Sequence, residues 1–153
     1  MKATYMKKWM MTIALMLCMA MSGQATAAPK VHTFEVGKSH FLLDGKPFVI
    51  KAAEIHYLRI PHQYWEHRIK MCKAMGMNTI CAYVFWNIHE QQEGVYDFTG
   101  NNDIRAFCKW AQKHGMYVIV RPGPYVCAEW EMGGLPWWLL KKKDIRLREQ
   151  DPY

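Results

Sequence analysis

Continuous apolar runs alternate with amphipathic stretches along this chain. The run at residues 79–86 is apolar almost throughout and lacks period-two alternation, which is typical of a parallel strand buried on both faces. Residues 117–120 form a similar run, and residues 51–57 form an earlier strand candidate. Apolar residues recur at helical spacing between these runs. The pattern therefore predicts parallel strands joined by helical crossovers.

Two amphipathic helices are predicted between the strands. The first begins at Pro61, and the second begins near Asn102 or Asp103, either of which can cap the free amides of a first turn. Gly76 and Gly115 end them and lie 39 residues apart, each leading into an apolar run. The apolar stripes are formed by Trp65, Ile69, Cys72 and Gly76, and by Ile104, Phe107, Cys108 and Ala111.

Repeated strand–helix units are compatible with an open doubly wound sheet or a closed barrel. No Gly-x-Gly-x-x-Gly fingerprint follows a strand, which disfavours a nucleotide-binding open sheet. Residues 41–50 read as a hairpin around Asp44-Gly45. We therefore predict an α/β fold: the N-terminal portion of a (β/α)8 TIM barrel, preceded by a β-hairpin. A whole barrel needs ~250 residues, so an incomplete domain is expected.

The first 27 residues have the layout of a secretory signal peptide. Three lysines precede an apolar run at residues 9–21, and small residues follow it. A run of 13 residues is too short to cross a bilayer, which needs ~20. We predict cleavage after Ala27, export to the periplasm or the exterior, no stable membrane anchor, and a catalytic-domain fragment at residues 28–153.

Charge and cysteine spacing narrow the function further. The leader contains three lysines, so its removal lowers the formal charge from +7 to +4. The lysines do not form a basic patch interleaved with aromatic residues, so we predict no nucleic-acid partner. Closely spaced Cys and His pairs are missing, so we predict no metal and no cofactor. Cys72, Cys81 and Cys108 are expected to be core thiols, whereas Cys127 falls in a loop.

Polar and aromatic residues follow each predicted strand, where the active sites of barrel enzymes gather. Aromatic rings pack on the CH-rich faces of sugars, and carboxylates accept hydrogen bonds from their hydroxyls. This mixture suggests a sugar pocket. The residues concerned are Glu54, His56, Tyr57 and Arg59 after the first strand, Tyr83, Trp86, Asn87, His89 and Glu90 after the second, and Arg121, Tyr125, Cys127, Glu129, Trp130 and Glu131 after the third.

A long motif after the third strand points to a known family. Residues 121–139 read RPGPYVCAEWEMGGLPWWL, which closely resembles the signature of glycoside hydrolase family 35, the β-galactosidases. Residues 55–61 and 83–90 agree with the same family, and the resemblance runs from about Phe34 to Tyr153. Ala53-Glu54 stands where many members have Gly-Ser or Gly-Glu.

The resemblance implies a retaining exo-glycosidase that removes terminal β-linked galactose from oligosaccharides or glycans. Tyr83, Cys127, Ala128 and Glu129 match positions that hold the galactose ring, with Glu129 as the main hydroxyl acceptor and the Ala128 backbone as a further contact. The family's acid/base, in an Asn-Glu pair, and its nucleophilic Glu are expected beyond Tyr153. No catalytic residue is therefore assigned within the chain.

Six further residues are predicted to support the site: His56, Tyr57, Arg59, Asn87, Glu90 and Arg121. The two arginines are expected to pair with carboxylates. Tyr83 is equally compatible with a purely structural place in the core.

Two alternatives stay open. A β-glucosaminidase or β-glucosidase on the same barrel is one, because these residues do not settle the preference for an axial or an equatorial hydroxyl. The other is a carbohydrate-binding remnant without turnover.

Overall fold

The computed structural model describes residues 31–147 and 149–151. The predicted signal peptide, residues 1–27, lies outside the described residues. Contacts divide the chain into two compact units, one ending at Phe48 and the other beginning at Val49. No helix within the described ranges is both long enough and apolar enough to cross a membrane.

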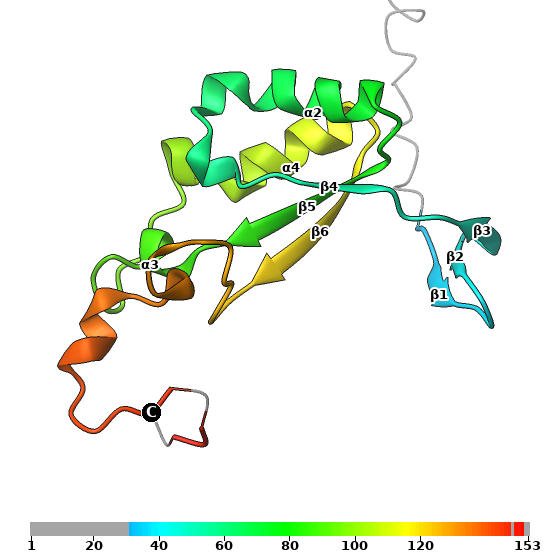
Figure 1. The fold of residues 1–153 in the computed structure, drawn as a ribbon. Coiled ribbons are helices and arrows are strands. Elements are labelled where there is room, and N and C mark those ends of the chain that lie inside the picture. Colours follow the sequence, from blue (N-terminus) through cyan, green and yellow to red (C-terminus); the bar gives the residue numbers. More distant parts are fainter. Residues whose placement is uncertain (1–30, 148, 152–153) are drawn as a thin grey trace, which may run out of the picture. The chain divides into compact units, whose positions relative to one another are not determined.

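The first unit contains a small antiparallel sheet in the order β1-β2-β3 (Figure 1). Its strands are β1 (Phe34–Val36), β2 (Phe41–Leu43) and β3 (Lys46–Phe48). Asp44 and Gly45 link β2 to β3 with φ angles of 52° and 72°. The sequence did not predict β1, because all three of its residues are exposed and no buried face marks it as a strand.

The second unit contains a parallel sheet in the order β4-β5-β6 (Figure 1). Its strands are β4 (Ala52–Glu54), β5 (Thr79–Val84) and β6 (Tyr117–Pro122). The central strand, β5, is buried along five of its six residues. The predicted parallel strands with helical crossovers, and hence the α/β class, are confirmed.

Both predicted helices are present and cover the same face of this sheet (Figure 1). They are α2 (Trp65–Ala74) and α4 (Ile104–Lys113). The carboxylate of Asp103 accepts a hydrogen bond from the Ala106 amide at 2.8 Å, which caps α4 at its first turn. Gly76 and Gly115 follow the two helices with φ angles of 86° and 64°, the left-handed conformation that ends a helix readily at glycine.

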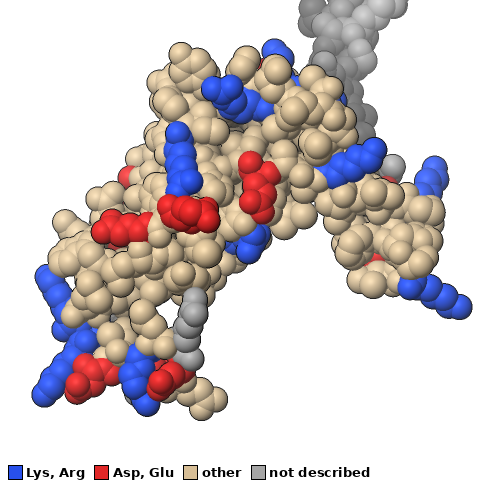
Figure 2. Space-filling model, viewed as in Figure 1, with Lys and Arg blue, Asp and Glu red and all other residues tan. Residues whose placement is uncertain are grey.

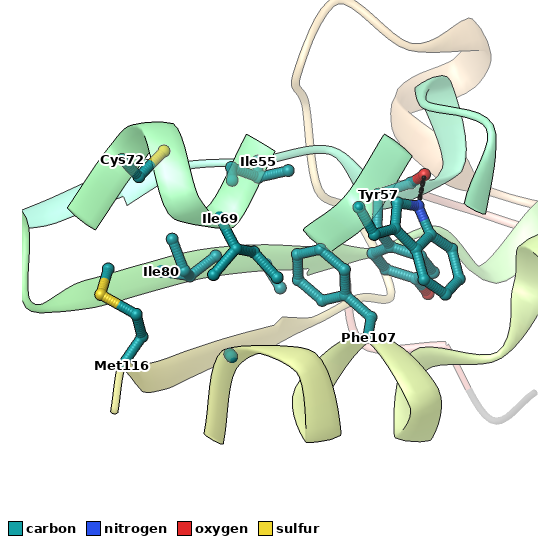
Figure 3. Packing of buried hydrophobic residues seen from close by; sticks show 10 residues of the cluster. Ile55, Tyr57, Ile69, Cys72, Ile80, Phe107 and Met116 are labelled. Carbon is teal, nitrogen blue, oxygen red and sulfur yellow. Dashed lines mark hydrogen bonds between the residues drawn. The ribbon is translucent and has the colours of Figure 1, made fainter. Parts of the chain in front are cut away.

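The main core lies between these helices and the sheet. Its side chains point toward one another from α2, α4, β5 and the segment after β4 (Figure 3). Residues of both predicted helical stripes take part, which confirms the faces that the periodicity assigned. The buried members are Ile55, Tyr57, Trp65, Ile69, Cys72, Ile80, Ala82, Phe107, Ala111 and Met116.

The predicted strand at residues 79–86 was too long at its end. The strand stops at Val84, and a short helix, α3 (Trp86–His89), begins two residues later. The apolar pattern did not reveal this change because Phe85 and Trp86 still pack, but in separate clusters. Short 3-10 turns complete the unit: η1 (Tyr57–Arg59), η2 (His62–Tyr64), η3 (Gly100–Asn102), η4 (Glu131–Gly134) and η5 (Trp137–Lys141).

Acidic and basic side chains are interspersed on the face of the second unit that Figure 2 shows. Three of the ion pairs that join its segments are Lys113 with Glu66, Arg121 with Glu54, and Lys142 with Glu93.

Candidate functional site

Side chains of β5 alternate between two faces of the sheet. Ile80 and Ala82 pack into the core under the helices. Cys81 and Tyr83 lie on the opposite face and form a separate cluster with Phe85, which directly follows the strand. The candidate site lies on this opposite face, toward the carboxyl ends of the parallel strands.

Three side chains meet there from three neighbouring strands. Glu54 is the last residue of β4, and Tyr83 and Arg121 are register partners on β5 and β6. The Tyr83 hydroxyl donates to Glu54 Oε1 at 2.9 Å and accepts a hydrogen bond from Arg121 Nη1. The Arg121 guanidinium carbon lies 4.2 Å from the centre of the Tyr83 ring, and Arg121 pairs with Glu54 at 3.6 Å. The predicted pairing of Arg121 with a carboxylate is confirmed.

The electrostatics of this cluster favour a protonated tyrosine. The hydrogen bond to Glu54, reinforced by burial, raises the pKa of Tyr83 above its ordinary value, although the charge of Arg121 opposes the rise. Glu54 was a candidate after the first strand, but the sequence assigned it no role at the site. Its place at the end of the first strand was the available signal, because carboxyl ends of adjacent parallel strands share one edge.

The loop after β6 holds the other predicted sugar contacts. Cys127, Ala128 and Glu129 are three consecutive residues in the left-handed region, with φ angles of 60°, 55° and 46°. This conformation is costly for residues other than glycine and persists where surrounding contacts enforce it. Cys127 and Glu129 are exposed, and Ala128 is half-buried.

Arg59 supplies contacts that hold this loop. Its Nη2 donates to the main-chain oxygens of Ala128 and Glu129, both at 2.9 Å. Its guanidinium carbon also lies 4.8 Å from the ring centre of Trp130. Arg59 thus supports the loop through main-chain oxygens, where the sequence had predicted a carboxylate partner.

Trp130 fastens the same loop to the end of β5. Its ring packs on Phe85 with the centres 4.4 Å apart, and its Nε1 donates to Asn87 Oδ1 at 3.0 Å. Asn87 therefore contacts this loop through Trp130. Trp130 was a candidate after the third strand, but the sequence assigned it no role, because its sequence neighbours do not reveal that it reaches α3.

His56 lies between the strand-end cluster and the loop. Its ring meets Tyr83 edge-on with the centres 4.9 Å apart. Burial and the charge of Arg59 lower the pKa of His56, while Glu54 and Glu129 both act to raise it. Glu54, His56 and Arg59 line one pocket, and Arg59 holds the main chain of Glu129. Glu54, Tyr83 and the Glu129 loop therefore border the same region at the carboxyl ends of the strands.

Tyr57, predicted to support the site, lies in the core instead. Its side chain is fully buried beneath the helices, and its hydroxyl shares a 2.6 Å hydrogen bond with His89 Nε2 (Figure 3 shows the Tyr57 ring). Burial raises the pKa of Tyr57 well above its ordinary value. The reason is local: the chain leaves β4 and turns at η1, which directs Tyr57 toward the helices.

Glu90 is a buried acceptor within the scaffold. Its carboxylate accepts hydrogen bonds from the Trp86 indole and from the Gly94 amide, the latter at 2.7 Å. Its main-chain oxygen accepts from Trp138 Nε1 at 2.9 Å. Burial acts to raise the pKa of Glu90, but the hydrogen bonds from Trp86, Gly94 and Tyr96 outweigh it and hold the pKa below its ordinary value.

The described residues contain no group of three or more His, Cys, Asp or Glu side chains placed to hold a metal ion. What the site offers is carboxylates, hydroxyl and amide groups beside aromatic rings. The family model of the glycosyl hydrolases family 35 matches residues 40–153.

The chain belongs to glycosyl hydrolase family 35. It is 46% identical to a β-galactosidase of Xanthomonas manihotis over 92% of this chain and 23% of that protein. It is 46% identical to the dog β-galactosidase and 44% identical to the human one, over 94% and 92% of this chain and 21% of each relative.

The chain spans only 21% to 23% of the length of these relatives. Among solved structures, it is similar to the exo-β-1,4-mannosidase Op5Man5 from Opitutaceae bacterium strain TAV5, with a TM-score of 0.47 and 23% identity over 65% of this chain and 18% of that one. This structural likeness is too distant to bear on the substrate.

Proposed function

We propose that this family 35 chain forms the N-terminal part of a retaining exo-β-galactosidase. Its substrate would be a terminal, non-reducing β-linked galactose of an oligosaccharide or glycan. The observation that carries the proposal is geometric: Tyr83 packs against His56, which lines one pocket with Arg59, and Arg59 holds the main chain of Glu129. Tyr83 and Glu129 match sugar-holding positions of the family. The β-galactosidase relatives support the choice of sugar.

The proposed fold of the whole domain is a (β/α)8 barrel. Three adjacent parallel strands with helices on one face are compatible with a segment of such a barrel. The candidate site lies at the carboxyl ends of these strands, where barrel enzymes carry their chemistry.

Within this proposal, the chain binds the sugar, and the reacting carboxylates come from strands other than β4, β5 and β6. Retaining hydrolysis needs two carboxyl groups ~5 Å apart, one acting as acid/base and one as nucleophile. Glu54 is engaged by Tyr83 and Arg121, and Glu90 is buried in the scaffold. Glu129 is exposed on its loop and is the proposed acceptor for sugar hydroxyls, with Cys127 and Ala128 lining the wall beside it.

The direct test replaces Glu129 in the full-length enzyme. Glu129→Gln should raise KM and lower kcat/KM on a nitrophenyl β-galactoside by roughly 10- to 100-fold, because a hydrogen bond to a charged group contributes ~1.5–3 kcal/mol. Glu131→Gln is the matched control, since Glu131 is an exposed carboxylate two residues away in η4. Equal kinetics for both variants and the wild type would remove Glu129 from the site.

A panel of nitrophenyl glycosides tests the sugar itself. We expect turnover of the β-galactoside and little of the β-glucoside or the β-glucosaminide. Preference for either of the latter would assign the alternative glycosidase activity, and binding without any turnover would assign a carbohydrate-binding remnant.

We further propose that residues 1–27 direct export and are removed from the mature protein. The charged start, short apolar run and small-residue segment of the sequence support this proposal. N-terminal sequencing of the secreted or periplasmic protein should begin at Ala28, and a chain that retains Met1 would contradict it.

A further inference from the structure

Glu54 accepts the only hydrogen bond that the Tyr83 hydroxyl can donate. The hydroxyl oxygen lies 2.9 Å from Glu54 Oε1. An ionised carboxylate accepts hydrogen bonds and has none to give, so the proton in this contact comes from the tyrosine.

Arg121 occupies the other side of the same hydroxyl. Its Nη1 donates to the Tyr83 oxygen, and a guanidinium cannot accept a hydrogen bond. A phenolic oxygen has one proton and two lone pairs. The proton is engaged in the hydrogen bond to Glu54, and one lone pair accepts the hydrogen bond from Arg121. Tyr83 therefore has one lone pair left to accept a hydrogen bond from a ligand and no proton left to donate.

The arrangement is held in place from several directions. Arg121 lies over the Tyr83 ring and pairs with Glu54, and the edge of the His56 ring packs against Tyr83. Tyr83 itself is only 6% exposed, so the packed side chains around it hold its ring and its hydroxyl oxygen in place. The raised pKa of Tyr83 keeps its hydroxyl protonated at neutral pH.

We infer that Glu54 is a positioning residue for sugar recognition: it fixes Tyr83 as a hydrogen-bond acceptor toward one hydroxyl of the bound galactose. This inference rests on the proposed function, which makes Tyr83 part of the sugar-binding wall. A sugar hydroxyl can donate or accept, so a neighbour of fixed polarity decides which of the two it does.

Fluorinated sugars test the polarity directly in the full-length enzyme. Dissociation constants are measured for galactose and for its deoxy and deoxyfluoro analogues at each ring hydroxyl. Fluorine can accept a weak hydrogen bond but cannot donate one. The hydroxyl that faces Tyr83 is the one at which deoxygenation no longer matters in Tyr83→Phe.

At that hydroxyl, the wild type should bind the deoxy and the deoxyfluoro analogue equally weakly, each roughly 3- to 10-fold weaker than galactose, as expected for one lost hydrogen bond. In Glu54→Ala the Tyr83 hydroxyl becomes free to donate its hydrogen bond to the ligand. The fluoro analogue should then bind tighter than the deoxy analogue, by only about two- to threefold because fluorine is a weak acceptor. Glu54→Gln retains an acceptor oxygen and should behave as the wild type does.

A merely structural role for Glu54 would change all affinities together and leave the fluoro-to-deoxy ratio unchanged. The inference would be overturned by an unchanged ratio in Glu54→Ala, or by a wild type that already prefers the fluoro analogue at this position. In either case, turnover of the galactoside would still support the proposed function. The wild-type comparison decides the polarity even if Glu54→Ala does not fold. Absence of both galactose binding and turnover in the wild type would overturn the proposed function and this inference with it.

Discussion

The guanidinium of Arg59 donates to the main-chain oxygen of Glu129 at 2.9 Å, across 70 residues of sequence. The same nitrogen reaches the oxygen of Ala128, so one side chain near the first strand holds two strained residues of the third-strand loop. The loop that carries the proposed hydroxyl acceptor is thus positioned from outside itself. Its geometry should depend on the planar shape of the arginine as well as on its charge.

Arg59→Lys should therefore impair sugar binding even though the charge is kept. A lysine ammonium is a compact point charge and cannot reproduce the flat guanidinium between the carbonyls and Trp130. We expect kcat/KM on a β-galactoside to fall about tenfold, mainly through KM, because about one net hydrogen bond is lost. Arg105→Lys, at an exposed position on α4, is the control and should leave the kinetics unchanged.

Tyr57→Phe should destabilise the fold rather than alter recognition directly. The substitution keeps the buried ring but leaves His89 Nε2 without the hydroxyl that lies 2.6 Å from it. A buried polar group that loses its partner costs ~1–3 kcal/mol in free energy of unfolding. Urea unfolding of the full-length enzyme measures this loss, and Tyr64→Phe, at a side chain that is 57% exposed, serves as the control. Equal stability of the two variants would contradict the core role of Tyr57.

Glu90→Gln should change how stability depends on pH. Hydrogen bonds hold the pKa of Glu90 below its ordinary value in the folded protein, so its carboxylate stabilises the fold above the unfolded pKa. That contribution is lost as the pH falls through the lowered folded value, below about 4.3.

The difference in Tm between wild type and Glu90→Gln should accordingly be large at pH 7 and shrink toward pH 3. The exposed Glu131→Gln is the matched control and should show a small difference at both pH values. A Glu90→Gln difference that grows on acidification would contradict the assigned direction of the pKa shift.

Gly133→Ala should disrupt the loop after β6, the proposed sugar wall, more than a comparable glycine substitution elsewhere. Gly133 and Gly94 both have positive φ angles, 61° and 80°, so alanine is strained at each by ~1–2 kcal/mol. A Cβ at Gly133 would also overlap the ring of Tyr125, whereas nothing lies within 4 Å of one at Gly94.

The clash should add about 1 to 3 kcal/mol to the loss of stability in Gly133→Ala. It should also weaken galactose binding, because the amide of Val126 donates to the Gly133 oxygen and closes the loop beside Cys127. Thermal unfolding and titration with galactose measure the two effects. Indistinguishable Gly133→Ala and Gly94→Ala variants would show that the loop tolerates the displaced Tyr125 ring.

Local sequence determined the two long helices and the parallel strands of this protein. The spacing of Ile69 and Cys72, the capping Asp103 and the glycines after both helices specify local conformation through backbone preferences and side-chain periodicity, which act over a few residues. The motif at residues 121–139 likewise indicated the family from sequence alone, because its residues are contiguous.

Tertiary structure alone decided which side chains meet. Glu54 and Arg121 lie 29 and 38 residues from Tyr83 in the chain and come together through the register of three parallel strands. A shift of one residue in that register would move every strand side chain to the opposite face. No local pattern specifies such a register, because it follows from how the whole core packs.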